Sequence, residues 1–211
     1  MKIKNGQAGV IFILDEVMTS RLAPGGLQST LSLKPDLTVL GKYLGGGLSF
    51  GAFGGRADIM SVYDPRQANH LMHNGTFNNN TLTMHVGYAG LSRIFTPDAC
   101  VKLNAAGDDF REKLLAVTAG TKVSFTGVGS ILASHCSNGG IEEVRKAGGV
   151  VHEILELKDL LWMHLLENGF WALRRGTMAI ILTTPQSELD RFVAVVEAFV
   201  KKYAMFVKLE V

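Results

Sequence analysis

A continuous apolar run near the start of the chain constrains the fold more than any other feature. Residues Gly9 to Leu14 carry no charge, are rich in β-branched and other apolar side chains, and end at Asp15. Such a run predicts a strand buried on both faces, as in a parallel sheet, where functional residues gather at the C-terminal ends of the strands. Residues 36–40 predict a second strand, which Gly41 and Lys42 follow. We therefore expect an α/β fold with Asp15 at the active end of its strand.

The pair Asp15 and Lys42 supplies the two side chains that pyridoxal phosphate chemistry requires. A lysine amine forms a Schiff base with the aldehyde of that cofactor, and a carboxylate keeps the ring nitrogen protonated so that the ring accepts carbanion electrons. The apolar and glycine-lined surroundings of Lys42 favour loss of the lysine proton. The alternative is structural, because Asp15 would equally cap the following turn and Lys42 would equally be a surface lysine beside a flexible loop.

The sequence around these two residues resembles that of a known protein family. Asp15–Arg21, Pro35–Lys42, Gly45–Gly47, Gly51–Arg56 and Asn74–Asn80 stand in the order found in the class III aminotransferases, and they look like the branch that holds glutamate-1-semialdehyde aminomutase and the β-amino-acid transaminases. The resemblance implies fold-type I and pyridoxal 5'-phosphate as cofactor. It also implies four roles: Asp15 as partner of the ring nitrogen, Val17 as the residue packed under the ring, Lys42 as the Schiff-base lysine and Thr76 as a ligand of the phosphate in a neighbouring subunit.

The chain departs from the family at its start. Met1 lies only a few residues before the Asp15 strand, where a complete class III enzyme has already built roughly half its length, so the phosphate loop and the stacking aromatic residue have no counterpart. Two hypotheses follow. The chain is either part of a transaminase or aminomutase, or a truncated, catalytically inactive remnant or gene-model fragment that acts at most as an assembly partner. We expect the chain alone to bind the cofactor weakly or not at all.

The expected organisation is the C-terminal part of a cofactor-binding large domain, with a mainly parallel sheet, over residues 1–96, and a small α+β domain over residues 97–211. Strands are predicted at 9–14, 36–40, 51–54, 121–126, 130–136, 170–174 and 178–183. Helices are predicted at 57–63, 78–95, 97–115, 157–167 and 187–203, and a glycine-rich loop at 138–152.

Arg174 and Arg175 follow a predicted strand in the small domain, where transaminases of this type often place an arginine that holds a substrate carboxylate. A solvated basic pair is the alternative. The expected partners are a small-molecule amino donor and a keto acid or semialdehyde, and a second copy of the chain or the missing N-terminal half. The segments after Asp15 and around Thr76 favour β-amino-acid transaminases slightly over aminomutases.

Composition excludes several other functions. With 21 basic and 19 acidic residues, the net charge of +2 gives no reason to expect nucleic acid or an anionic membrane as partner. The longest apolar runs are too short to span a membrane. Neither the two cysteines nor the six histidines have the spacing of a metal site, so no metal is expected. The cysteine usage indicates a reducing compartment, with the cytoplasm as the expected location. A mean hydropathy of +0.20 indicates exposed apolar surface.

Overall fold

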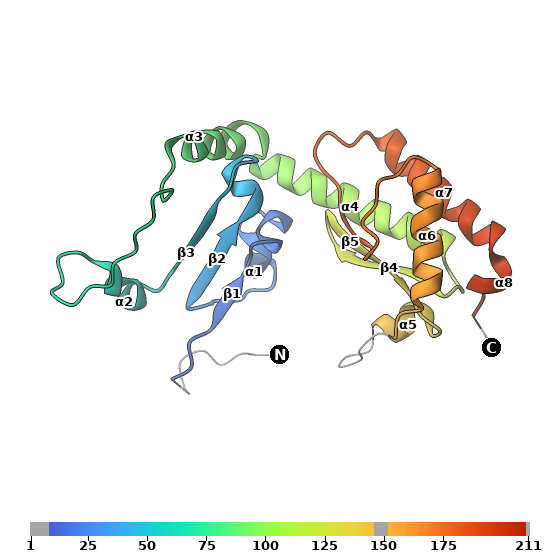
Figure 1. The fold of residues 1–211 in the computed structure, drawn as a ribbon, viewed down its shortest axis with the longest axis horizontal. Helices are drawn as coiled ribbons and strands as arrows, with labels where there is room; N and C mark the ends of the chain where they lie inside the picture. The colour runs from blue at the N-terminus through green and yellow to red at the C-terminus, as the bar shows by residue number, and fades with distance from the viewer. Residues whose placement is uncertain (1–8, 146–151, 210–211) are drawn as a thin grey trace. The chain divides into compact units, whose positions relative to one another are not determined.

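The computed structural model describes residues 9–145 and 152–209. The chain divides into two compact units, Met1–Val101 and Lys102–Val211. Figure 1 labels the helices α1 to α8 and the strands β1 to β5. None of the helices in the described ranges is both long enough and apolar enough to cross a membrane.

The first unit contains a three-stranded sheet with the order β1, β2, β3. Its strands are β1 (Ile13–Asp15), β2 (Leu37–Gly41) and β3 (Gly51–Gly55). β1 and β2 run parallel, with Asp15 opposite Val39, whereas β2 and β3 run antiparallel (Figure 1). The described part of the sheet is thus mixed, not mainly parallel. The reason is the link between β2 and β3, which is too short for a parallel crossover.

The expectation that the first strand is buried on both faces is wrong for the described structure. β1 begins only at Ile13, and the side chains of Val10, Ile11 and Ile13 are 73%, 53% and 56% exposed. β1 lies at the edge of the described sheet, where it pairs with β2 alone. The apolar sequence therefore marks a surface that its own unit does not cover.

The first unit also contains several short helices, and a longer helix begins near its end. They are the 3-10 turns η1 (Thr19–Leu22), η2 (Lys42–Gly45) and η3 (Ser61–Tyr63), with α1 (Gly26–Thr30), α2 (Ala57–Met60), α3 (Thr81–Ala89) and the π-helical turn η4 (Gly90–Ile94). The helix expected at 78–95 starts three residues late because the Asn80 side chain caps it, accepting a hydrogen bond from the Thr83 amide at 3.1 Å. The next helix, α4 (Pro97–Val117), starts at Pro97 as the sequence predicts.

The second unit is an antiparallel sheet with helices. Its strands are β4 (Val123–Val128), β5 (Ile131–Cys136) and β6 (Thr177–Ala179), in that order. The helices are α5 (Gly140–Val144), α6 (Leu155–Glu167), α7 (Gln186–Lys202) and α8 (Ala204–Val207). The core joins α4, the sheet, α6 and α7 through fully buried side chains: Leu114, Phe125, Leu132, Leu161, Val196 and Phe199. The large number of buried apolar residues accounts for a stable α+β arrangement.

Three sequence predictions in this unit differ from the structure. The predicted loop at 138–152 contains α5, while residues 146–151 lie outside the described part of the chain. The predicted strand at 170–174 is an irregular segment, held on α6 by a hydrogen bond from the Trp162 Nε1 to the Ala172 carbonyl oxygen at 3.0 Å. Tertiary contact with α6 therefore overrides the strand propensity of this segment. Of the strand predicted at 178–183, only residues up to Ala179 pair with β5.

Candidate active site

Lys42 occupies a special backbone position directly after β2. Its φ angle is +56°, in the left-handed region, and it shares a positive φ with only two other non-glycine residues of the described ranges, Ser32 and Asn79. This conformation costs a side-chain-bearing residue about 1–2 kcal/mol. The Lys42 side chain is exposed and has no hydrogen bond or ion pair within residues 9–145 and 152–209. Its amine is thus available for chemistry.

Asp15 lies at the same edge of the sheet. It is the last residue of β1 and pairs in parallel with Val39, three positions before Lys42 on the neighbouring strand. Ideal strand geometry puts such positions on the order of 10 Å apart. Asp15 is exposed, and its Oδ1 accepts a hydrogen bond from the Val17 amide at 2.9 Å. The carboxylate accordingly combines the turn-capping role of the structural alternative with access to a ligand.

Val17 lies against the backbone that leads to Lys42. A Cβ atom placed on Gly41 would be 3.5 Å from Val17 Cγ1 and 3.6 Å from Val17 Cγ2. Val17 lies two residues after Asp15, in the turn that follows β1, and its amide donates to Asp15 Oδ1. The structure thus brings Asp15, Val17 and Lys42 to one sheet edge, as the sequence predicts.

Sequence reasoning missed Glu16. Its side chain is completely buried and accepts hydrogen bonds from the Thr19 hydroxyl, the Leu27 amide and the Gln28 amide, at 2.7, 3.1 and 2.6 Å. A buried carboxylate is stable only when several donors satisfy it. An acidic residue between two residues with proposed site roles was the signal that could have identified it.

The turn after Lys42 packs tightly against α3. A Cβ atom on Gly87 would lie 2.4 Å from the Leu44 carbonyl oxygen, and one on Gly46 would lie 2.6 Å from Val86 Cγ1. Gly46 also has a φ of +63°. These glycines allow backbone to approach backbone, so part of the glycine run after Lys42 is a packing surface and not a flexible loop.

Thr76 lies apart from these residues in the first unit. It is exposed in a turn in which the Asn78 amide donates to the Gly75 carbonyl oxygen at 3.0 Å. The loop before it is attached to the sheet by the His73 ring, whose centroid is 5.3 Å from that of Phe53. In the described ranges no hydrogen bond or ring contact joins Thr76 to Asp15 or Lys42. Its phosphate role stays a prediction.

Arg174 and Arg175 belong to the second unit. Arg174 already holds a carboxylate, because its Nε and Nη2 donate to the two oxygens of Asp159 at 2.6 and 2.5 Å. This contact raises the pKa of the Arg174 guanidinium above its usual value. Arg175 is exposed. The substrate role of both residues stays a prediction.

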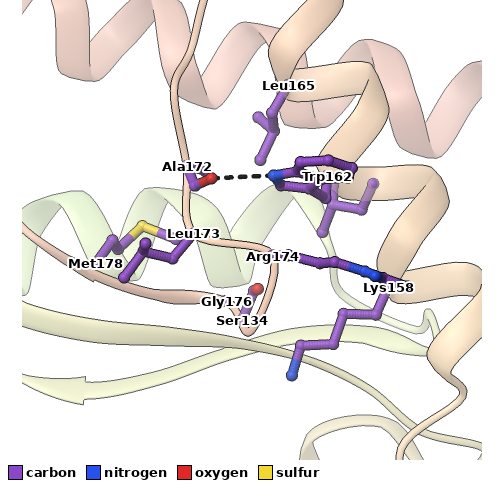
Figure 2. Close-up of a pocket in the computed structure, with 10 residues that line it drawn as sticks. Ser134, Lys158, Trp162, Leu165, Ala172, Leu173, Arg174, Gly176 and Met178 are labelled. Carbon is purple, nitrogen blue, oxygen red and sulfur yellow. Dashed lines mark hydrogen bonds between the residues drawn. The ribbon is translucent and has the colours of Figure 1, made fainter.

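Figure 2 shows the small cavity beside Arg174, between α6, the 172–176 segment and the sheet. Its polar lining comes from Ser134, Lys158 and Arg174 and its apolar lining includes Trp162 and Met178. The volume of about 10 Å³ is roughly that needed by one water molecule. The cavity is therefore too small for an amino-acid substrate. In the described ranges no three histidine, cysteine, aspartate or glutamate side chains are grouped as metal ligands.

Comparison with known proteins matches these motifs to longer relatives. An uncharacterised aminotransferase of Schizosaccharomyces pombe is 52% identical over 200 residues, covering 95% of this chain and 45% of the relative. The β-phenylalanine transaminase of Variovorax paradoxus is 45% identical over 196 residues, covering 92% and 44%. A glutamate-1-semialdehyde 2,1-aminomutase of Sorangium cellulosum is 40% identical over 134 residues, covering 62% and 30%. The chain thus spans less than half the length of these relatives.

Solved structures show the same relationship in three dimensions. The β-phenylalanine aminotransferase of Variovorax paradoxus superposes with a TM-score of 0.90 at 42% identity, over 97% of this chain and 47% of that one. A transaminase with pyridoxal phosphate bound superposes with a TM-score of 0.78 at 27% identity, over 92% and 44%. The fold is therefore the α/β fold of these transaminases. The profile of the family described as Aminotransferase class-III matches residues 5–195. The chain belongs to the class III aminotransferase family.

Proposed function

We propose that this chain carries the lysine-bearing part of a pyridoxal-phosphate-dependent aminotransferase site. One observation supports this proposal above the others: the parallel pairing of Asp15 with Val39 puts Asp15 and Lys42 at one end of two adjacent strands. The residues present suit the cofactor, because a lysine amine that has no partner in the described ranges, an exposed carboxylate and an apolar side chain lie at the same edge. Family membership and the cofactor in a related transaminase agree with it.

Each residue has a defined task in this proposal. When bound, pyridoxal phosphate supplies an electron sink for the carbanion that forms on the substrate. The Asp15 carboxylate would hold the proton on the ring nitrogen, and Val17 would keep water from one face of the ring. Lys42 Nζ would hold the cofactor through its aldehyde and, as a free amine, would move a proton between two carbon atoms.

The remaining assignments concern phosphate and substrate. The Thr76 hydroxyl and amide bind the phosphate group in a neighbouring subunit, which requires a homodimer or a pairing with the remainder of a longer family protein. Arg175 or Arg174 binds the substrate carboxylate. For Arg174 the substrate must compete with Asp159, so Arg175 is the better candidate in the described conformation. Residues 1–96 serve as part of the large domain and residues 97–211 as the small domain.

The proposed substrates are a β-amino acid as amino donor and a keto acid as acceptor. This choice is supported by the greater identity and coverage of the β-phenylalanine transaminase than of the aminomutase. A second candidate is a truncated remnant that acts only in assembly, which the coverage of less than half of each relative supports. Cys100 and Cys136 are buried and form no disulfide in the described ranges, which suits a reducing compartment such as the cytoplasm.

Covalent trapping tests the proposal directly. The chain is incubated with millimolar pyridoxal phosphate, reduced with borohydride and mapped by peptide mass spectrometry. The label is expected on Lys42 and is lost in Lys42→Ala. Lys34→Ala is the matched control, because Lys34 is the nearest lysine along the chain and is also exposed. Equal labelling of Lys42→Ala and the parent would refute the assignment.

Turnover separates the two candidates. The chain is assayed for amino transfer from β-phenylalanine to 2-oxoglutarate, alone and with the N-terminal half of a related transaminase added. The proposal predicts transfer only in the combined sample, with loss of the reaction in Asp15→Asn despite retained labelling of Lys42. Labelling without transfer in the combined sample would favour the remnant. Turnover of glutamate 1-semialdehyde without an acceptor would instead favour an aminomutase.

A further inference from the structure

Glu16 is the buried residue between the two proposed cofactor contacts on β1. Its side chain has no exposed surface, whereas the Asp15 side chain is exposed and the Val17 side chain is half-buried. A carboxylate so placed loses its hydration and needs charge-assisted hydrogen bonds in return. Its location is therefore maintained by particular partners and not by apolar packing.

The side chain ties the end of β1 to the α1 segment. Its oxygens accept from the Leu27 and Gln28 amides, and Thr19 donates from the intervening turn. The approach depends on Gly26, whose φ is +73° and whose missing Cβ would lie 2.8 Å from Glu16 Oε1. The Glu16 side chain consequently anchors the turn after Asp15 to α1.

The backbone of Glu16 is held as well. Its amide donates to the Val39 carbonyl oxygen at 2.9 Å, which extends the pairing of β1 with β2. Its carbonyl oxygen accepts from the Ser20 amide at 3.0 Å. Because Asp15 Oδ1 in turn accepts from the Val17 amide, a shift of Glu16 is passed to both neighbouring side chains.

We propose that Glu16 is a positioning residue that fixes Asp15 and Val17 in the orientation that cofactor binding requires. The proposal rests on the function proposed above. Glu16 itself touches neither cofactor nor substrate. Its carboxylate must have both its charge and its length, because the NH2 group of a neutral amide would point at the amide of either Leu27 or Gln28, and a shorter acid would not reach them.

The test uses the complete chain in five forms: parent, Glu16→Gln, Glu16→Asp, Thr19→Val and Glu112→Gln. Thr19→Val removes one of the three hydrogen bonds and is a milder change if Glu16→Gln folds poorly. Glu112 is exposed on α4 and is the matched control for loss of one carboxylate. Amide hydrogen exchange of residues 15–17 is measured without cofactor. The apparent Kd for pyridoxal phosphate is measured by absorbance with the N-terminal half of a related transaminase added and with Lys42→Ala as blank.

In Glu16→Gln we expect exchange of the Val17 amide to accelerate about tenfold or more, and the apparent Kd to rise about tenfold or more. Thr19→Val should show the same changes at smaller size, Glu16→Asp should not restore the parent values, and Glu112→Gln should match the parent. Unchanged exchange at residues 15–17 would overturn the proposal. So would faster exchange with an unchanged Kd, because Glu16 would then serve the fold alone. If the parent combined with that N-terminal half gives no signal above the Lys42→Ala blank, the proposed function fails for this chain, and the exchange data alone decide whether Glu16 holds Asp15 and Val17.

Discussion

The contact of α3 with the turn after Lys42 leads to a quantitative prediction. Gly87→Ala would place a methyl group 2.4 Å from the Leu44 carbonyl oxygen, 1.0 Å closer than the 3.4 Å at which ordinary contact begins. The atom that it meets is backbone and cannot rotate away as a side chain can. Either α3 or the Lys42 turn must move.

The magnitude follows from two opposing effects. Overpacking of this kind costs about 1–3 kcal/mol, and a backbone obstacle puts the cost near the upper value. Alanine in place of glycine inside a helix returns about 1 kcal/mol. We therefore expect Gly87→Ala to reduce the free energy of unfolding by about 2 kcal/mol, taking the difference of these two estimates.

Gly90→Ala is the matched control. Gly90 follows α3 directly, and its Cβ would meet only Gly46 Cα at 3.9 Å, which is ordinary contact. This variant keeps the propensity gain without the clash, so it should be up to about 1 kcal/mol more stable than the parent. At about 2–4 °C per kcal/mol for a chain of this size, the two variants should differ in Tm by roughly 6–12 °C.

Differential scanning fluorimetry measures this difference, and borohydride labelling of Lys42 reports whether the turn has moved. Reduced labelling should accompany the lower Tm of Gly87→Ala alone. If Gly87→Ala and Gly90→Ala had the same Tm and the same labelling, the close packing of α3 on the Lys42 turn would be refuted.

Three further predictions follow from single residues. Lys42→Gly should be more stable than Lys42→Ala by about 1–2 kcal/mol in urea unfolding, because glycine accepts the positive φ without strain; equal midpoints would contradict this. The hydrogen bonds from Arg56 and the Phe12 amide hold the pKa of Asp36 below its usual value, so their stabilisation is present above about pH 4 and is lost as pH falls further. In Asp36→Asn, the midpoint of unfolding should therefore change less with pH below that value than it does in the parent. An equally steep pH dependence in both would exclude Asp36 as the cause. Burial raises the pKa of the Cys136 thiol to about 12, so native protein should leave Cys136 unalkylated by iodoacetamide at pH 8, whereas urea should expose it; rapid native alkylation would disagree.

Local patterns were sufficient to predict most of the secondary structure. Pro97 marked the start of α4 correctly, because proline suits the first helical turn. The strands predicted at 121–126 and 130–136 correspond to β4 and β5, although β4 extends to Val128, into the segment predicted to join them. Residues 170–174 were misassigned, because the hydrogen bond to Trp162 on α6 is a tertiary contact that no local pattern contains.

The candidate site likewise has features that local sequence predicts and features that it does not. The positions of Asp15 and Lys42 at strand ends follow from local sequence, and the structure has them so. The burial of Glu16 could not be predicted locally, because its donors Leu27 and Gln28 lie 11 and 12 residues away. The pairing of Arg174 with Asp159 likewise joins residues that are 15 positions apart and belong to different elements.

The exposed edge at β1 has a practical consequence for handling the protein. Val10, Ile11 and Ile13 present exposed apolar side chains just before and within β1, and the outer side of this strand is unpaired in the described sheet, which makes it a template for a strand of another molecule. Asp15 is the first charge after this run and is the only residue in 9–15 that opposes such stacking. Protein concentration, more than temperature, should therefore determine how long a preparation remains monodisperse, and dilute samples suit every measurement proposed above.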